Sequence, residues 1–406
     1  MRPILVTLHR WLGLATALFL FIAGLTGALI SWDHEIDEWL NPALFDNTSP
    51  GTPLSPLELA NRLEAADPRL QVRFMPLHVD AGHTLTVFID PRIDPSTGKP
   101  FDLDFNQVML DPVSGAIQGT REWGRIALDR AHLMPFLYKL HYTMHLPDIG
   151  TLPLGTLFMG VVGTVWVIDT LIAMWISCPS LASWRRSFAF RWQAGGYRLT
   201  FDLHRSGGAW LFMLVLMVAV TSVSMNLKEQ VMRPVVSLFS DLSPSPFELA
   251  RPSPDGTPVT PGRTREDIAG QAQAIGQARG WQTPMGGIFH SAQFGAYCVG
   301  FYEPGRAHGD VGLGNRWLYF DSRTGELLGA EVPGTGSAGD LFLQAMFPLH
   351  SGRIIGIPGR ALMSVLGVAI AALSVTGVLI WARKRRARRM RRASGTVLPA
   401  GELTSP

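Results

Sequence analysis

The histidines are the side chains whose placement in this chain points most directly to chemistry. The sequence contains 11 histidines. Six of them fall within one or two helical turns of the end of a long apolar segment: His9, His34, His141, His145, His204 and His350. Ionisable residues are rare within membrane segments and often mark functional sites there, and neutral imidazole is a common metal ligand. A lone histidine at a membrane edge can also be an ordinary interfacial side chain, so the arrangement of the six matters.

Two short motifs each occur twice, which indicates an internal duplication. The paired segments are "LHRWLG" (8–13) with "LHRSGG" (203–208), and "LDPVSGAIQG" (110–119) with "FDSRTGELLG" (320–329). From the last glycine of the second motif to the histidine of a later Leu-His pair is 141 − 119 = 22 residues in one copy and 350 − 329 = 21 in the other. Each repeat therefore contains a helix, an external domain, a Leu-His pair and a second helix. Such duplications in membrane proteins usually place the functional site between the repeats.

The duplication groups four histidines into two equivalent pairs. His9 corresponds to His204, and His141 corresponds to His350. Two imidazoles related by a pseudo-twofold axis can bind one haem iron from opposite sides, and bundle interiors often hold cofactors. We therefore expect two b-type haems. His9 and His204, the inner pair, would lie at the cytoplasmic ends of the helices. His141 and His350, the outer pair, would lie at the external ends.

The segment "LYKLHYTMHLP" (137–147) places a second histidine beside the outer pair. His145 follows His141 by four residues, so on one continuous helix both rings share a face and cannot bind one iron from opposite sides. His145 could instead hold a haem propionate, ligate a separate haem with His34, or face substrate. A shift of the repeat alignment by one turn would make His145 the axial ligand in place of His141.

Glycines accompany the inner pair. Gly13 and Gly208 each lie one turn after a histidine of the inner pair, on the same helix face. A missing side chain there would make room for a flat porphyrin, although close helix packing in membranes also selects glycine. The glycines of "AGLTGA" (23–28) are expected to serve helix packing, because we expect no histidine at their depth.

Asp169 is the one acidic residue within the apolar segments. An intramembrane carboxylate is a candidate functional group. It could pair with an arginine or histidine at the cytoplasmic haem, or take a proton from a quinol. A neutral acid hydrogen-bonded to the backbone or to Thr170 explains its presence equally well.

Composition and hydropathy indicate an integral membrane protein. The chain is 47% hydrophobic and only 17% charged, and four apolar stretches reach the roughly 20 residues that a span needs. These stretches are Trp11–Trp32, Leu152–Ile176, Ser206–Leu227 and Ala361–Trp381. The predicted organisation is helix 1 (1–32), an external domain (33–151), helix 2 (152–176), a cytoplasmic loop (177–205), helix 3 (206–227), a second external domain (228–360), helix 4 (361–381) and a basic tail (382–406).

Basic residues set the expected orientation. The run "RKRRARRMRR" (383–392) and the arginines of the 177–205 connection favour the cytoplasmic side for both segments and both termini. The two large domains then lie outside, in the periplasm of a Gram-negative cell. We interpret the tail as a positive-inside anchor rather than a nucleic-acid binding segment. Cys178 and Cys298 fall on opposite sides, which excludes a disulfide between them.

Each external domain has the pattern of a small α+β unit. "SPLELANRLEAADP" (55–68) has a serine cap and helical spacing, "HTLTVFID" (83–90) alternates as a strand does, and 110–119 follows a strand–turn–strand pattern. The second domain repeats this order, and its helix is expected in "TREDIAGQAQAIGQARG" (264–280). The Pro- and Gly-rich stretch 241–263 is a linker or an ordered loop.

These motifs together resemble a known family. "LHRWLGLATALFLFIAGLTGALISWDHEIDEWLNP" (8–42), the two "D-x-x-[ST]-G" hairpins and "FPLHSGRIIGIPGR" (347–360) are similar to the PepSY-associated transmembrane helix family. The resemblance covers nearly the whole chain before the basic tail. It implies a four-helix transmembrane bundle with two PepSY-like external domains. The best-understood members look like inner-membrane ferric-siderophore reductases that carry b-type haem.

We accordingly expect a protein of the bacterial inner membrane that passes electrons outward and reduces a ferric siderophore or other ferric chelate, releasing ferrous iron. The 177–205 connection is too short for a flavin or nicotinamide domain, so the electrons would come from a quinol or a cytoplasmic reductase. The main alternative is a non-enzymatic protein whose PepSY-like domains bind peptides or restrain a protease. A transporter is a third possibility, disfavoured because four helices leave little room for a pathway.

Overall fold

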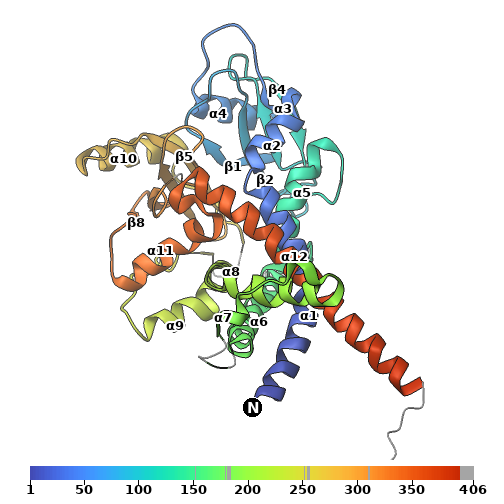
Figure 1. Ribbon diagram of the computed structural model, residues 1–406. Helices are drawn as coiled ribbons and strands as arrows, with labels where there is room; N and C mark the ends of the chain where they lie inside the picture. Colours follow the sequence, from blue (N-terminus) through green and yellow to red (C-terminus); the bar gives the residue numbers. More distant parts are fainter. Residues whose placement is uncertain are drawn as a thin grey trace, which may run out of the picture.

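Long apolar helices form one end of the molecule, and a β-sheet forms the other (Figure 1). The computed structural model describes residues 1–150, 152–178, 180, 184–250, 252–253, 257–309 and 311–393. Residues 394–406, which belong to the predicted basic tail, lie outside the described residues. Within it, three helices are long and apolar enough to cross a membrane, and a fourth, bent helix brings the number to four if its halves form one span. The long helices are α1 (Arg2–Ile30), α6 (Leu154–Ser177), α8 (Gly196–Asn226) and α12 (Ile357–Ala393).

Two of the long helices extend well beyond their predicted bounds of 206–227 and 361–381. α8 begins ten residues before Ser206, so part of the expected 177–205 loop is helical. Its early turns are held by Asp202, which is fully buried and ion-paired with Arg191 at 2.7 Å. α12 does not end at Trp381 but continues through the basic run to Ala393. Hydropathy indicates only the apolar part of a helix. Backbone hydrogen bonds can continue the helix through the polar residues on either side.

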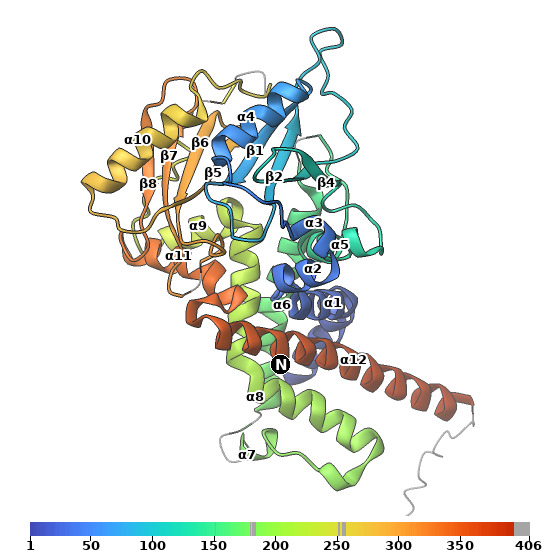
Figure 2. The same cartoon turned by 90° about the horizontal axis from the view of Figure 1, so that it is seen from above.

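α8 is bent rather than straight, which the sequence-based span did not anticipate. Its two parts, Gly196–Trp210 and Phe212–Asn226, meet at an angle of 70°. Ser206, Gly207 and Gly208 lie in the turn before the bend, and Gly/Ser pairs are a common cause of sharp helix kinks. Figure 2 shows the two parts of α8 running in different directions, and the first part contacts α12 through His204 and Leu373.

In the described residues, eight strands form one antiparallel sheet in the order β4-β3-β2-β1-β5-β6-β7-β8. The strands are β1 (Leu70–Pro76), β2 (Leu85–Pro91), β3 (Gln107–Leu110), β4 (Ile117–Arg121), β5 (Met285–Ser291), β6 (Ala296–Phe301), β7 (Arg316–Asp321) and β8 (Leu327–Glu331). The four strands of each repeat follow one another as a meander. The expected hairpins at 110–119 and 320–329 are present as β3–β4 and β7–β8.

The two predicted external units are therefore joined edge to edge. β1 pairs with β5, with Met75 opposite Ile288. The helices α4 (Pro56–Ala66) and α10 (Arg265–Ala278) pack against the sheet, and one apolar core runs through both units. The expected serine cap is confirmed, because Ser55 accepts a hydrogen bond from the backbone NH of Glu58. Pairing buries edges that two separate sheets would leave exposed.

Short helices join the sheet to the long helices or the long helices to one another. They are α2 (Asp33–Leu40), α3 (Pro42–Phe45), α5 (Arg130–Thr143), α7 (Trp184–Ser187), η1 (Trp192–Ala194), η2 (Lys228–Met232), α9 (Arg233–Ser237), α11 (Ala338–Ser351) and η3 (Arg353–Ile355). α5 and α11 are equivalent in the two repeats and lie between the sheet and the long helices (Figure 2). Each ends one or a few residues after a Leu-His pair, so these helices carry the outer histidines.

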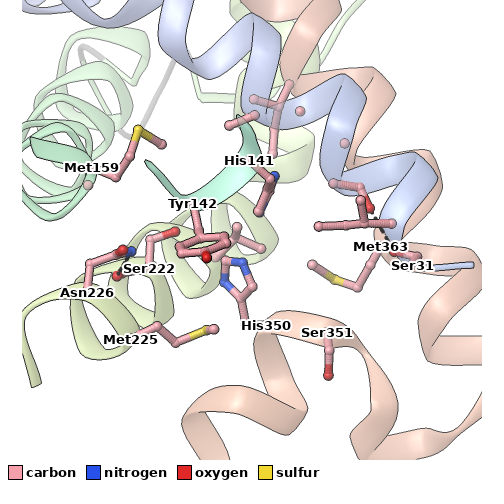
Figure 3. A pocket seen from close by; sticks show the side chains of 18 of the residues that line it. Ser31, His141, Tyr142, Met159, Ser222, Met225, Asn226, His350, Ser351 and Met363 are labelled. Atoms are coloured by element: carbon pink, nitrogen blue, oxygen red, sulfur yellow. Dashed lines mark hydrogen bonds between the residues drawn. The ribbon is translucent and has the colours of Figure 1, made fainter. Parts of the chain in front are cut away.

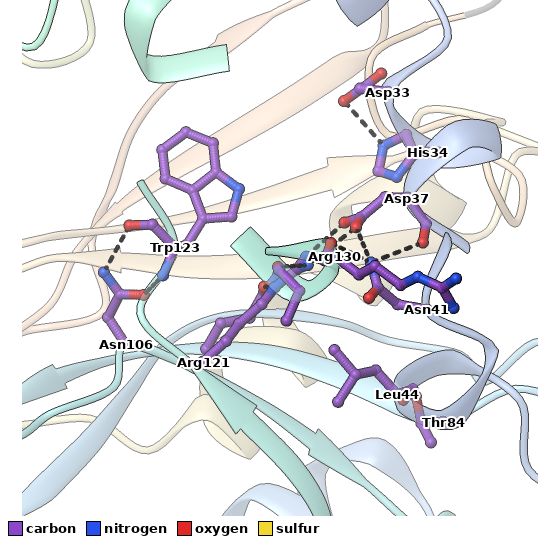
Figure 4. Close-up of polar contacts among 12 residues, drawn as sticks. Asp33, His34, Asp37, Asn41, Leu44, Thr84, Asn106, Arg121, Trp123 and Arg130 are labelled. Carbon is purple, nitrogen blue, oxygen red and sulfur yellow. Dashed lines mark hydrogen bonds and ion pairs between the residues drawn. The ribbon is translucent and has the colours of Figure 1, made fainter. Parts of the chain in front are cut away.

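A buried polar network fixes α5 and α2 to the sheet (Figure 4). Arg121 at the end of β4 donates to Asp37 of α2 at 2.6 Å and to the Ala131 carbonyl of α5 at 2.7 Å. Asn41 donates to the Arg130 carbonyl at 2.9 Å and also to Asp37 at 2.8 Å. Because the Arg121 side chain is only 2% exposed, this network holds the start of α5 in one position relative to the sheet.

Candidate functional site between the repeats

The structure brings the four predicted histidines together as two facing pairs. The ring centres of His9 and His204 lie 6.1 Å apart, and those of His141 and His350 lie 6.2 Å apart. Figure 3 shows His141 and His350 approaching one space from α5 and α11. Each pair takes one histidine from each repeat, as the duplication predicts.

The two pairs lie at different levels of the helical region. His9 is near the start of α1, whereas His141 packs against Thr26 and Gly27 near its end. The separation along α1 is 27 − 9 = 18 residues, which at 1.5 Å per residue is about 27 Å. This is close to the roughly 30 Å thickness of a bilayer's hydrocarbon core.

In the outer pair, each ring donates a hydrogen bond from Nδ1 to a threonine hydroxyl. His141 Nδ1 lies 3.1 Å from Thr26 Oγ1, and His350 Nδ1 lies 3.0 Å from Thr221 Oγ1. Each hydroxyl already donates its single proton to a backbone carbonyl of its own helix. The hydroxyl must therefore accept from the ring, which places the ring proton on Nδ1 and leaves Nε2 as a lone pair.

In the inner pair, too, Nδ1 of each ring carries the proton, but its hydrogen-bond acceptors are different. His9 Nδ1 lies 2.8 Å from Oδ1 of Asp169, and His204 Nδ1 lies 3.0 Å from the Leu373 carbonyl. A carbonyl only accepts, so His204 carries its proton on Nδ1. The expected interaction of Asp169 with a histidine at the inner site is thus present in the structure. Thr376 Oγ1 is a second contact of His204 Nδ1, at 3.2 Å.

All four Nε2 atoms are consequently available as ligands. Hydrogen bonds on the opposite ring nitrogen orient metal-binding histidines and fix their tautomer. Burial lowers the pKa of His141 to about 4 and that of His350 to about 3, so both rings are neutral at pH 7. Two nitrogens about 2 Å from one metal ion put the ring centres about 6 Å apart, which the observed spacings match. The donor set therefore fits bis-imidazole ligation at both levels.

A cavity of 440 Å³ surrounds the outer pair. Its inner wall is apolar, with Leu20, Trp166 and Val218 among the lining side chains, and its outer rim carries Tyr138 and Arg353. The volume falls within the range of roughly 300–1,000 Å³ typical of cofactor sites. The half-buried Arg353 guanidinium is suited to a carboxylate at the rim. The apolar interior fits a porphyrin ring and Arg353 could pair with a propionate, while Asp33, which also lines the cavity, adds a negative charge near that arginine.

Glycines make room for the histidines at positions other than those first expected. A Cβ on Gly27 would lie 2.9 Å from Cε1 of His141, and one on Gly377 would lie 3.0 Å from Cε1 of His204. Gly24 meets the backbone of Gly367, so the expected packing role of the 23–28 glycines is confirmed there. The expectation that no histidine shares their depth is wrong, because α5 carries His141 inward to Gly27.

The two glycines singled out beside the inner pair have different surroundings. A Cβ on Gly13 would lie 3.5 Å from Oδ2 of Asp169, and one on Gly208 would meet no atom within 4 Å. The space at Gly13 thus adjoins the Asp169 carboxylate, whereas the space at Gly208 is open.

His145 is not on the same helix face as His141, contrary to expectation. α5 ends at Thr143, and both Met144 and His145 have left-handed backbone conformations. The ring of His145 stacks on Phe136, and its Nε2 lies 3.0 Å from the Phe136 carbonyl. The ring proton is therefore on Nε2. His145 is turned toward its own helix, and it is His141 that faces His350.

His34 contacts His308, which is not among the six histidines near the ends of the apolar segments. The ring centre of His34 lies 5.6 Å from that of His308. His34 Nε2 lies 4.0 Å from a carboxylate oxygen of Asp33. His34 and His145 are therefore not brought together as a second haem ligand pair. His308 lines both the outer cavity and a neighbouring cavity of 430 Å³. Burial lowers the pKa of His308 to about 4.

The comparisons with known proteins agree with this architecture. The family model for the PepSY-associated TM region matches residues 6–384, and the chain therefore belongs to this family of membrane proteins. No curated protein matches the chain.

Proposed function

We propose that this protein is a b-type haem protein of the bacterial inner membrane that carries electrons outward and reduces a ferric chelate, such as a ferric siderophore, on the external side. The observation that carries the proposal is the set of two facing histidine pairs about 27 Å apart along α1, each ring with a free Nε2. A single pair would serve one cofactor; two stacked pairs suit transfer across the membrane.

The residues of this chain bind, orient and shield the cofactors. His9 and His204 would hold the inner haem, and His141 and His350 the outer one. The Nδ1 partners prevent the rings from turning, and the apolar helices exclude water. When bound, haem supplies a one-electron carrier whose iron alternates between ferric and ferrous states.

Charge and the position of the sheet support the proposed orientation. The N-terminus and the far end of α12 lie on the side away from the sheet (Figure 1), and the end of α12 is strongly basic. The positive-inside tendency puts that side in the cytoplasm. The sheet and the outer histidine pair then face the periplasm, where a ferric chelate arrives. A quinol or a cytoplasmic reductase would supply electrons at the inner pair.

A vesicle assay tests direction and substrate together. Right-side-out membrane vesicles energised from within should reduce an impermeant ferric chelate, and His350→Ala should abolish this while the inner haem remains reducible by its donor. Gln substitution of the surface residue Arg62, on the exposed side of α4, is the matched control and should leave the rate unchanged. Equal rates in wild type and His350→Ala would refute the proposed route.

A further inference from the structure

The hydrogen-bond partners of the four histidines follow the duplication at the outer pair and depart from it at the inner pair. The offset between the repeats is 204 − 9 = 195 residues for the inner histidines. The same offset relates the outer partners, because 221 − 26 = 195, and both of these residues are threonines. The outer pair therefore has two equivalent, neutral partners.

The inner pair breaks this symmetry with a charged group. The hydrogen-bond partners of the inner pair come from α6 and α12, the second long helix of each repeat. α12 offers His204 the neutral Leu373 carbonyl and the Thr376 hydroxyl. α6 offers His9 a carboxylate, Asp169, at 2.8 Å. Its side chain is only 10% exposed, so solvent screens it little.

We infer that Asp169 is a positioning residue that acts through His9 to hold the reduction potential of the inner site below that of the outer site. A carboxylate acceptor on Nδ1 makes the ring a stronger electron donor through Nε2. A negative charge near a buried metal also favours its more positive, oxidised state. Each electron lost at the inner site is gained at the outer site, with no bond formed or broken. The asymmetry therefore makes outward transfer favourable.

This inference rests on the proposed function, because it presupposes haem at the inner pair. The test is a redox titration of the full-length protein, followed by the haem absorbance. A His350→Ala background removes the outer ligand, so that the signal comes from the inner site. The variants are Asp169→Asn and Asp169→Ser, the latter giving His9 a hydroxyl such as the outer histidines have. Thr376→Val is the matched control, because it removes a neutral contact from the same site.

Both Asp169 variants should raise the inner midpoint potential so that the reduction equilibrium shifts by at least tenfold, which is about 59 mV for one electron. In otherwise wild-type protein the outer component should not move. Thr376→Val should shift the inner component by much less. An unchanged potential with haem retained, or a Thr376→Val shift as large as that of Asp169→Asn, would overturn the inference.

Loss of the inner haem from both Asp169 variants would also overturn it, since Asp169 would then be needed for binding rather than for the potential. These outcomes leave the proposed function standing. Wild-type protein without haem would instead refute the proposed function itself, so the two failures are distinguishable.

Discussion

Replacing Gly27 by alanine should disturb the outer histidine pair and leave the inner pair intact. The added Cβ would lie 2.9 Å from Cε1 of His141, whereas ordinary contact begins at 3.4 Å. The ring must therefore move by about 0.5 Å, more than the roughly 0.2 Å by which ligand distances in metal sites vary. α1 cannot retreat instead, because Gly24 holds its backbone against Gly367 of α12.

The expected consequence is weaker binding of the outer haem by about 10- to 100-fold, the usual effect of disturbing the surroundings of a metal ligand. The assay is haem transfer from the purified protein to an excess of a haem-free acceptor protein, with the haem that remains identified by its spectrum. Gly377→Ala is the reciprocal control, because its Cβ would lie 3.0 Å from Cε1 of His204 and should loosen the inner haem only. If the two variants lose the same haem, or neither loses any, the assignment of glycines to sites is wrong.

Three further predictions test the ligands and the support around them. His204→Ala should remove the inner haem and His350→Ala the outer one. Each variant should keep about half the haem, because sites about 27 Å apart act independently. The haem content per chain measures this, and complete loss of haem in either variant would contradict it. Asp37→Ala should lower the free energy of unfolding by about 3–5 kcal/mol, because it leaves Arg121 charged and buried; a midpoint within 1 °C of wild type by thermal melting would show that the pair contributes nothing. Burial lowers the pKa of His290 to about 4, whereas a histidine in the unfolded chain titrates at about 6.5. As the pH falls below about 6.5 the unfolded chain therefore binds the proton first, and the stability present above that pH declines toward pH 4. Wild type should lose more stability than His290→Gln between pH 7 and 5, and parallel losses would contradict this.

The pairing of the histidines could be predicted because the duplication carries the information. Equivalent positions in two copies of one fold face each other across the pseudo-twofold axis, so His9 and His204 could be matched from "LHR" alone. The same offset also relates Thr26 to Thr221, and applying it to every polar residue of the apolar segments would have identified the outer hydrogen-bond partners.

Other features have no local signal in the sequence. The pairing of β1 with β5 joins segments more than 200 residues apart, and neither strand reveals its neighbour. Met144 and His145 adopt left-handed conformations that are uncommon for such residues, so a continuous helix was the natural expectation. The depth of His141 depends on how α5 is anchored by Arg121, a tertiary contact.

The haem content of the purified wild-type protein tests the central claim most directly. Protein from haem-replete cells should bind two b-type haems per chain, with the reduced-minus-oxidised spectrum of low-spin iron held by two imidazoles. A colourless preparation would contradict the account and leave the paired sheet units to be understood as binding modules.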